Sequence, residues 1–436
     1  MVLGKFEVIH DMSIKHRFAR IKDNQEARTL ISNFSYLTLL QIAGYVFPLF
    51  TLPYLARVIG TDGFGKLAFA SAIIVWFTTI ADWGFNFTST RDVAQNRDNI
   101  KKISEIFSTV LYGRIILCIA TFALLLLLIF IIPKFKENAL LIILTFLQIP
   151  GNILFPVWLF QGLERMKYTT LLNLLVKLVF ALSIFIFINK PDDYIYQPII
   201  TATGFLLSGI ISTYIIICKW HIKIIKIPVK NVLNTIKSNT DIFINNIMPN
   251  FYNSFSVALL GFIGTDAMVG IYDAGKKFMH IAYQFMSIIS RTFFPYLARK
   301  HEKFNLFERF YLIIGLFTSI TLFFCSPILI KLFYGDPFIE SITILQIVSV
   351  SIFFIAMQSV YGTNYLLIKR KEKTLRNITL ISSSIGFIIA FPLIFYFKAI
   401  GTALTYTISS LILGLLSMIY AKKYNHINNS TINKTI

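Results

Sequence analysis

Seven polar side chains follow one another at steps of three and four residues between positions 266 and 299, in a stretch that is otherwise almost entirely apolar. They are Asp273, Lys276, Lys277, His280, Gln284, Ser287 and Arg291. At about 100° per residue they fall within an arc of about 100° on a helix. Ammonium and guanidinium groups gathered in this way bind anionic groups such as phosphate. The pattern predicts a helix with one face toward lipid or packed protein and the other toward a wet, charged space.

Asp273 stands three and four residues before Lys276 and Lys277, a spacing at which opposite charges pair along a helix. One interpretation is therefore an internal ion pair with a purely structural role. One carboxylate cannot neutralise both lysines and Arg291 as well, so the surplus charge on this face is positive. A cation at the centre of a bilayer costs about 2.5–3.5 kcal/mol. We expect these groups to face a cavity, to pair with one another, or both, and we favour a phosphate or pyrophosphate ligand.

Three other apolar stretches carry polar residues or prolines on one face. In chain order these are Thr38, Gln41, Tyr45 and Pro48; Ser71, Thr78 and Asp82; and Asn246, Pro249, Asn250 and Asn253. Four polar-faced helices are what a central, water-filled cavity requires, and prolines are tolerated where cavity water satisfies the freed carbonyls. Asp82 is either the partner of a membrane cation or a site for a coupling proton or Na⁺. The sequence leaves both interpretations of Asp82 open.

Arg114 and Lys177 also fall within apolar stretches, each near a cytoplasmic end. Their long side chains are expected to reach the inner membrane interface by snorkelling. The cysteines Cys118, Cys218 and Cys325 have no metal-ligand spacing, and the six histidines form no cluster. The sequence therefore predicts buried free thiols, no metal site and no cofactor.

The composition defines the class of protein that must position these residues. Of 436 residues, 56% are hydrophobic and 14% are charged, whereas a soluble domain has about 25% charged residues. The net charge of +20 does not indicate nucleic acid, because Lys and Arg sit mainly in short connections between apolar stretches. The chain is therefore expected to be a polytopic helical membrane protein.

A membrane-spanning helix needs about 20 mostly apolar residues. Twelve stretches meet this criterion: 34–56, 67–86, 108–132, 139–160, 169–189, 198–218, 242–263, 267–297, 308–330, 339–364, 377–397 and 402–421. The connections on the expected cytoplasmic side hold 28 of the 41 Lys and Arg, the opposite connections hold 7, and the spans hold 6. This bias follows the positive-inside rule and predicts that both termini are cytoplasmic.

A short internal repeat suggests that the chain has two halves. Ile59-Gly60-Thr61-Asp62 recurs 204 residues later as Ile263-Gly264-Thr265-Asp266, and both copies fall between corresponding spans. We therefore expect an all-α membrane protein of twelve transmembrane helices in two six-helix bundles around a central cavity. The expected division is a cytoplasmic lead-in at 1–32, a first bundle at 33–218, a basic linker at 219–240, a second bundle at 241–421 and a cytoplasmic tail at 422–436.

The linker carries lysines at steps of three and four residues among isoleucines. They are Lys219, Lys223, Lys226 and Lys230, with Pro228 between the last two. The pattern fits a basic amphipathic segment on the anionic inner leaflet, and a solvated linker fits it equally well. The chain has no Gly-rich phosphate loop, no G-x-S-x-G and no long outer loop. These features favour a transporter over a membrane enzyme.

Four groups of residues resemble the O-antigen (Wzx-like) flippases of the multidrug/oligosaccharidyl-lipid/polysaccharide superfamily. They are Phe47-Pro48-Leu49 with residues 53–60 (PYLARVIG) and 63–65 (GFG); residues 82–85 (DWGF) with 90–94 (TRDVA); residues 158–166 (WLFQGLERM); and residues 270–277 (GIYDAGKK). The resemblance extends over nearly the whole chain beyond residue 30. It implies that spans one, two, seven and eight line the cavity, in agreement with the polar faces.

The resemblance also implies a substrate and a location. The substrate would be an oligosaccharide linked to undecaprenyl pyrophosphate, moved across the bacterial cytoplasmic membrane by alternating access coupled to an ion gradient. Lys276, Lys277 and Arg291 would attract the pyrophosphate, Asn246, Asn250, Asn253 and Gln284 would bind sugar hydroxyls, and Asp82 or Asp273 would take part in ion coupling. Membrane lipids and other polysaccharide-assembly membrane proteins are the expected partners. A multidrug exporter of the same superfamily is one alternative and an O-antigen polymerase is a weaker one.

Overall fold

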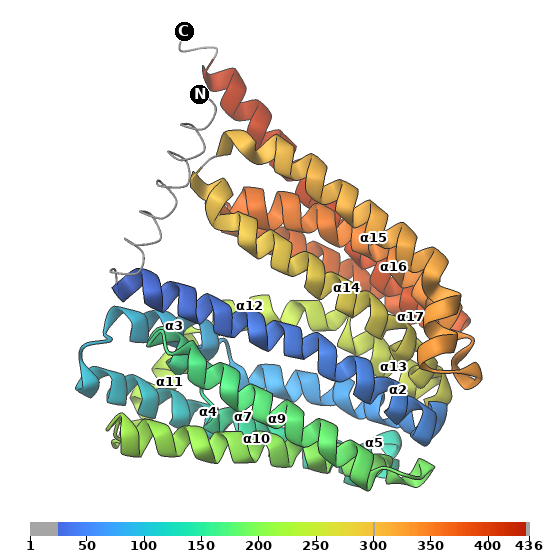
Figure 1. Cartoon of the computed structure of the whole chain (residues 1–436), viewed down its shortest axis with the longest axis horizontal. Helices are drawn as coiled ribbons and strands as arrows, with labels where there is room; N and C mark the ends of the chain where they lie inside the picture. Colours follow the sequence, from blue (N-terminus) through green and yellow to red (C-terminus); the bar gives the residue numbers. More distant parts are fainter. Residues whose placement is uncertain (1–24, 300, 433–436) are drawn as a thin grey trace, which may run out of the picture.

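In the computed structural model, residues 25–299 and 301–432 are described, and every regular element in those ranges is a helix. The helices form two arms that lie against each other at one end and diverge toward the other (Figure 1). α2 begins and α17 ends at the diverging side. One arm contains α2 to α12 and the other contains α14 to α17, with α13 near the end where the arms meet.

The first arm is built from long spanning helices and several short ones. Its elements are α2 (Gln25–Asp82), α3 (Phe85–Gln95), α4 (Ile100–Ile131), α5 (Pro133–Glu137), α6 (Ala139–Phe146), α7 (Gln148–Leu154), α8 (Val157–Gly162), α9 (Met166–Phe187), the 3₁₀ turn η1 (Pro191–Ile195), α10 (Tyr196–Tyr214), the π-helical η2 (Ile215–Lys219), α11 (Val229–Ser238) and α12 (Thr240–Ile247). α2 passes through a break at Gly60, whose φ of 67° and ψ of −174° are not helical. Glycine has no Cβ and adopts positive φ without strain.

The second arm follows a short broken segment. Its elements are η3 (Met248–Phe251), α13 (Ser254–Ile263), α14 (Asp266–Arg299), η4 (His301–Lys303), α15 (Phe304–Phe333), η5 (Asp336–Phe338), α16 (Ser341–Met357), the π-helical η6 (Gln358–Leu367) and α17 (Glu372–Ile432). α17 has its own break at Lys398, where φ is 48°. Gly264, the repeat partner of Gly60, lies at the break between α13 and α14.

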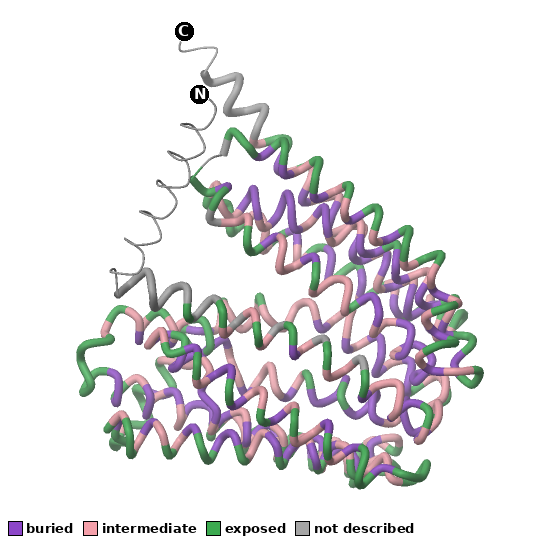
Figure 2. Tube along the Cα trace, in the orientation of Figure 1, coloured by how far each residue is buried: buried purple, intermediate pink, exposed green. Residues whose placement is uncertain are grey.

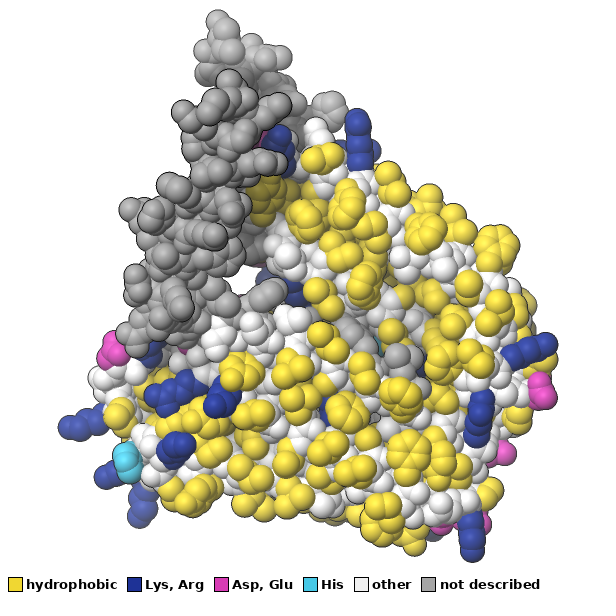
Figure 3. Space-filling view, in the orientation of Figure 1, with side chains coloured by type: hydrophobic (Ala, Val, Ile, Leu, Met, Phe, Trp, Pro, Cys, Tyr) yellow, Lys and Arg dark blue, Asp and Glu magenta, His cyan; other side chains and the backbone are white. Residues whose placement is uncertain are grey.

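Eight helices in the described ranges are long and apolar enough to cross a membrane. Two of these, Thr38–Gln95 and Glu372–Tyr424, each cover two of the expected spans because the chain continues through a kink. The number of crossings, expected to be twelve, stays a prediction. Figure 3 shows apolar side chains spread over the visible face of both arms, as a membrane protein requires, while Figure 2 shows the buried residues inside each arm.

The structure interrupts two stretches whose residue pattern suggested regular helix. The stretch at 242–263 is not one continuous helix, because a 3₁₀ turn that includes Pro249 separates α12 from α13; proline has no N–H to donate and blocks regular helix. The four lysines of the basic linker do not share one helix, because Lys219 ends η2, Lys230 lies in α11, and residues 221–228 between them have no regular secondary structure. The backbone N–H groups of Lys223 and Ile225 instead donate to Ser104 Oγ (3.0 Å) and Ser108 Oγ (2.9 Å) on α4.

Candidate functional site

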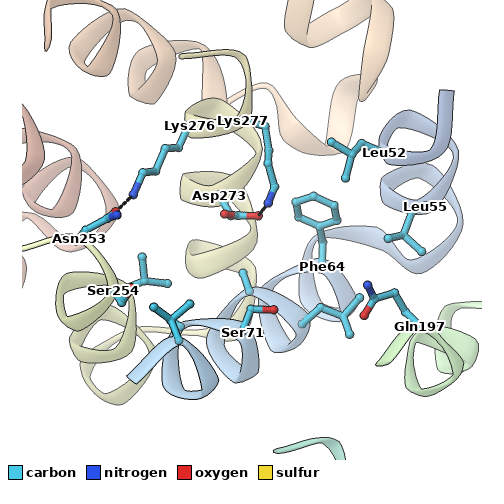
Figure 4. A pocket seen from close by; sticks show the side chains of 15 residues that line it. Leu52, Leu55, Phe64, Ser71, Gln197, Asn253, Ser254, Asp273, Lys276 and Lys277 are labelled. Atoms are coloured by element: carbon cyan, nitrogen blue, oxygen red, sulfur yellow. Dashed lines mark hydrogen bonds and ion pairs between the residues drawn. The ribbon is translucent and has the colours of Figure 1, made fainter. Parts of the chain in front are cut away.

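A cavity of about 200 Å³ lies where the two arms meet, between α2, α13 and α14 (Figure 4). Its α2 wall is mostly apolar and includes Leu52 and Ser71, which come from either side of the break at Gly60. Its α14 wall carries three charged side chains, Asp273, Lys276 and Lys277. The lining thus draws on the spans that the polar faces singled out, and its lysines outnumber its carboxylates.

Lys277 and Asp273 form an ion pair along α14. Lys277 Nζ lies 3.2 Å from Asp273 Oδ2, and the two side chains are 38% and 21% exposed. This is the internal pair that the spacing allowed. Because Lys277 remains more than a third exposed and lines the cavity, its ammonium has room for a second anionic partner.

Lys276 points the other way and has no carboxylate partner among the described residues. Its Nζ donates to Asn253 Oδ1 on the turn before α13 (Figure 4). The same ammonium lies 4.6 Å from the ring centre of Tyr406 and 5.4 Å from that of Tyr272. Aromatic faces attract a cation through their quadrupole but leave its charge in place. The surplus positive charge of the cavity wall is therefore held by neutral groups.

The cavity is closed at one end by aromatic packing between the arms. Phe64 of α2 lies 5.8 Å from Phe338 and 6.1 Å from Tyr334, measured between ring centres. Phe278 of α14 packs against the same Tyr334 at 5.6 Å. All four rings are buried. Lys134 of α5 adds an ion pair across the arms, with its Nζ 3.0 Å from Asp266 Oδ1 at the start of α14.

A second polar cavity of about 330 Å³ lies within the first arm and contains Asp82, Arg114 and Asn246. Arg114 is 6% exposed, and its Nη2 lies 3.4 Å from Asp82 Oδ1. The expectation that Arg114 snorkels to the interface is therefore wrong, because the half-buried carboxylate of Asp82 offers it a partner. Nearby, Asn250 Nδ2 donates to Thr79 Oγ1 at 3.1 Å, which joins the turn η3 to α2.

The predicted site residues therefore separate into groups instead of forming one site. Lys276, Lys277, Asp273 and Asn253 line the first cavity, while Asp82 and Asn246 line the second. Arg291 is exposed and stands 14 residues beyond Lys277 on α14, about 21 Å along the axis at 1.5 Å per residue. Gln284 is half-buried and is not part of either lining. Of the first-span candidates, the side chains of Gln41 and Tyr45 lie outside the described residues.

Sequence reasoning missed Tyr406, one of the two tyrosines near Lys276, and Gln197, which lines the cavity on the α10 side. Tyr406 belongs to α17 and Gln197 to α10, both far along the chain from α14. No periodic pattern links residues at such separations. Within the described ranges, no three His, Cys, Asp or Glu side chains meet in a way that would hold a metal ion.

The fold has counterparts among solved transporter structures. A lipid II flippase, MurJ, in an inward-closed conformation superposes with a TM-score of 0.70 at 15% identity, covering 88% of this chain and 87% of that one. An inward-facing multidrug resistance MATE transporter of the MOP superfamily superposes with a TM-score of 0.66 at 13% identity, covering 92% of this chain and 99% of that one. The chain therefore shares its fold with these two solved structures.

The chain belongs to the polysaccharide biosynthesis protein family, whose sequence profile matches residues 30–301. It is 28% identical over 408 residues to a protein of Escherichia coli (strain K12) named "Putative O-antigen transporter", covering 92% of this chain and 98% of that one. A Shigella dysenteriae protein of the same name is 27% identical, with 88% and 98% covered. The names of these two relatives and of the two solved structures describe transporters or a flippase.

Proposed function

We propose that the protein moves a lipid-linked oligosaccharide, carried on undecaprenyl pyrophosphate, from the inner to the outer leaflet of the bacterial cytoplasmic membrane. The observation that carries this proposal is the surplus cation Lys276 beside the Asp273–Lys277 pair, in a cavity where two divergent arms meet. A pyrophosphate group supplies the missing negative charge. The O-antigen transporter relatives and the fold shared with a lipid II flippase support the same class of substrate.

Alternating access is the proposed mechanism, and it needs two halves that rock around a fixed site. We propose twelve crossings in two six-helix halves, with both termini cytoplasmic. Gly60 and Gly264 stand at breaks in equivalent places of the repeat, which supports the two halves. Basic side chains gather at the end that carries α3 and α11, on the diverging side of the arms (Figure 3). By the positive-inside rule this end faces the cytoplasm, so the conformation is open inward.

Within this mechanism the two cavities have different roles. Lys277 and Lys276 hold the pyrophosphate, and Asn253 and Ser71 hydrogen-bond the first sugar. Arg291, on the exposed cytoplasmic part of α14, attracts the lipid head before it reaches the lysines. Asp82, paired with Arg114 in the first arm, is the proposed ion-coupling group, because protonation of its carboxylate would release the arginine. Asp273 competes with the substrate for Lys277.

The test is complementation of a deletion strain. Lys276→Ala together with Lys277→Ala should abolish surface polysaccharide while the protein still accumulates in the membrane. Lys190→Ala, an exposed lysine in the connection after α9, is the matched control and should restore normal polysaccharide. Normal polysaccharide from the double variant would contradict the site assignment. Drug sensitivity of the deletion strain with its polysaccharide intact would favour the multidrug exporter instead.

A further inference from the structure

A third pocket, of about 270 Å³, lies beside the site between α2, α9 and α10. Phe47, Pro48, Val176 and Phe180 give it apolar walls, and the remaining lining residues are Thr51, Lys177, Gln197 and Thr201. Residues that flank it on the adjacent helix faces are strongly exposed, with Phe50 at 69% and Leu182 at 57%. In a membrane protein, exposed apolar residues of spanning helices face lipid. The pocket therefore opens on the lipid-facing side of the first arm.

Lys177 is the only charged residue in this lining. It stands midway along α9, and its ammonium reaches across to α2, where a Cβ on Gly44 would lie 3.1 Å from Nζ. It has no carboxylate partner among the described residues. An unpaired cation at this depth is costly unless an anion or water joins it. The half-buried side chain therefore lies against α2 and does not extend to the interface, in contrast to the snorkelling expected from the sequence.

Gln197 connects the third pocket with the site. It lines both the third pocket and the first cavity, and Figure 4 shows its side chain turned toward the first cavity. Its Nε2 donates to Thr201 Oγ1 at 3.3 Å, which fixes the side chain at the boundary. One molecule can therefore have a polar part in the first cavity and an apolar part in the third pocket.

We propose that this third pocket is a subsite for the lipid part of the substrate: the first isoprenoid units lie between α2, α9 and α10, and Lys177 pairs with the phosphate nearest to the chain. This inference rests on the proposed function and adds where the chain of the lipid is held. The pocket is smaller than the 300–1,000 Å³ typical of sites that enclose a whole drug-sized ligand. It therefore holds only the start of the chain, and the rest stays in the bilayer.

The test measures thermal stabilisation of the purified full-length protein by three probes, each titrated separately. Undecaprenyl phosphate has chain and phosphate, inorganic pyrophosphate has no chain, and phosphatidylglycerol is an anionic lipid of the bilayer. Lys177→Met keeps the length of the side chain and removes its charge, and Thr201→Phe fills the pocket. Lys190→Met, at an exposed lysine, and Leu182→Phe, at a lipid-facing leucine, are the matched controls.

We expect Lys177→Met to bind undecaprenyl phosphate at least about tenfold more weakly than wild type, since a charge-assisted hydrogen bond accounts for about that factor. Thr201→Phe should weaken binding as well, because its ring occupies the space of the isoprenoid chain. Both variants should bind pyrophosphate as tightly as wild type does, because Lys276 and Lys277, which are proposed to hold it, lie in the first cavity. If wild type binds undecaprenyl phosphate and both variants bind it equally well, the subsite is wrong and the proposed function stands. Equal stabilisation by phosphatidylglycerol would make the pocket a general lipid site and overturn the inference. If wild type binds no undecaprenyl phosphate, the proposed function fails together with the subsite.

Discussion

Gly65 and Gly270 bring the backbones of α2 and α14 into direct contact at the closed end of the arms. A Cβ on Gly65 would lie 1.7 Å from the carbonyl oxygen of Asp266, and a Cβ on Gly270 would lie 2.2 Å from that of Thr61. Small residues allow this approach in membrane proteins, where helices are held together by close packing. The crossing lies beside the aromatic cluster, so both features close the cavity on the same side.

Gly65→Ala should destabilise the closed end, because the atom it meets is backbone and cannot swing aside. Overpacking of this kind costs about 1–3 kcal/mol, so we expect a lower melting temperature and slower transport. Gly63→Ala is the control, since the nearest atoms to its Cβ would belong to the side chain of Ile59 and not to the α14 backbone. Equal melting temperatures for the two variants would show that α2 and α14 do not approach as described.

The Lys134–Asp266 ion pair should help to keep the outer end shut. It is partly exposed, at 24% and 17%, so its contribution is about 1 kcal/mol. The reporter is a cysteine in the cavity, Ser71→Cys, in a protein whose native cysteines are replaced. Lys134→Asp or Asp266→Lys should each raise the rate at which an impermeant maleimide, added from outside, labels this cysteine. The exchange of both charges should return labelling to the starting rate. Labelling that stays high in the exchanged protein would indicate that the pair does not hold the arms.

Asp82 and Arg114 should behave as a unit. Removal of one partner leaves an uncompensated buried charge, which costs about 3–5 kcal/mol. Arg114→Met is therefore expected to lower the melting temperature strongly, and Asp82→Asn added to it should restore much of the loss. If the pair also couples an ion, the double variant should be stable and inactive in transport. Additive losses in the double variant would contradict a direct interaction.

Ser104 and Ser108 should hold the connection between the halves on α4. Their hydroxyls accept the backbone N–H groups of Lys223 and Ile225. Ser104→Ala with Ser108→Ala is expected to release this segment and to speed trypsin cleavage after the exposed Lys223 and Lys226. Thr109→Ala is the control, because the Thr109 hydroxyl bonds only to Glu105 of its own helix. Unchanged cleavage in the double variant would show that other contacts hold the segment.

The sequence was informative wherever a local pattern determines the structure. The apolar spans follow from the length of the apolar runs, and the charged face of α14 follows from periodicity. The repeat at Gly60 and Gly264 marks two real breaks in the helices. The i, i+4 spacing anticipated the Asp273–Lys277 pair. In each case the interacting residues are neighbours on one helix or in one connection.

The remaining features depend on contacts between distant segments. Lys276 is held by Asn253 and Tyr406, and Arg114 is held by Asp82, across helices that no spacing rule relates. The lysine periodicity around Lys223 was misleading because serine hydroxyls on α4 offered the backbone an alternative to a helix. The seven polar residues predicted on one face of α14, from Asp273 to Arg291, extend over too much of the helix to bind one group together. Helical spacing defines a face but not a depth in the membrane.

The most direct test of the account is lipid flipping in proteoliposomes. A fluorescent oligosaccharide on undecaprenyl pyrophosphate is placed in both leaflets, and an impermeant quencher reports how much becomes accessible. With wild type and with Lys190→Ala, we predict that the quencher rapidly removes the fluorescence of the inner leaflet as well, because the lipid is flipped outward. With Lys276→Ala plus Lys277→Ala, we predict that the inner-leaflet half of the fluorescence remains. Flipping by the double variant at the wild-type rate would contradict the claim that these two lysines hold the pyrophosphate of the substrate.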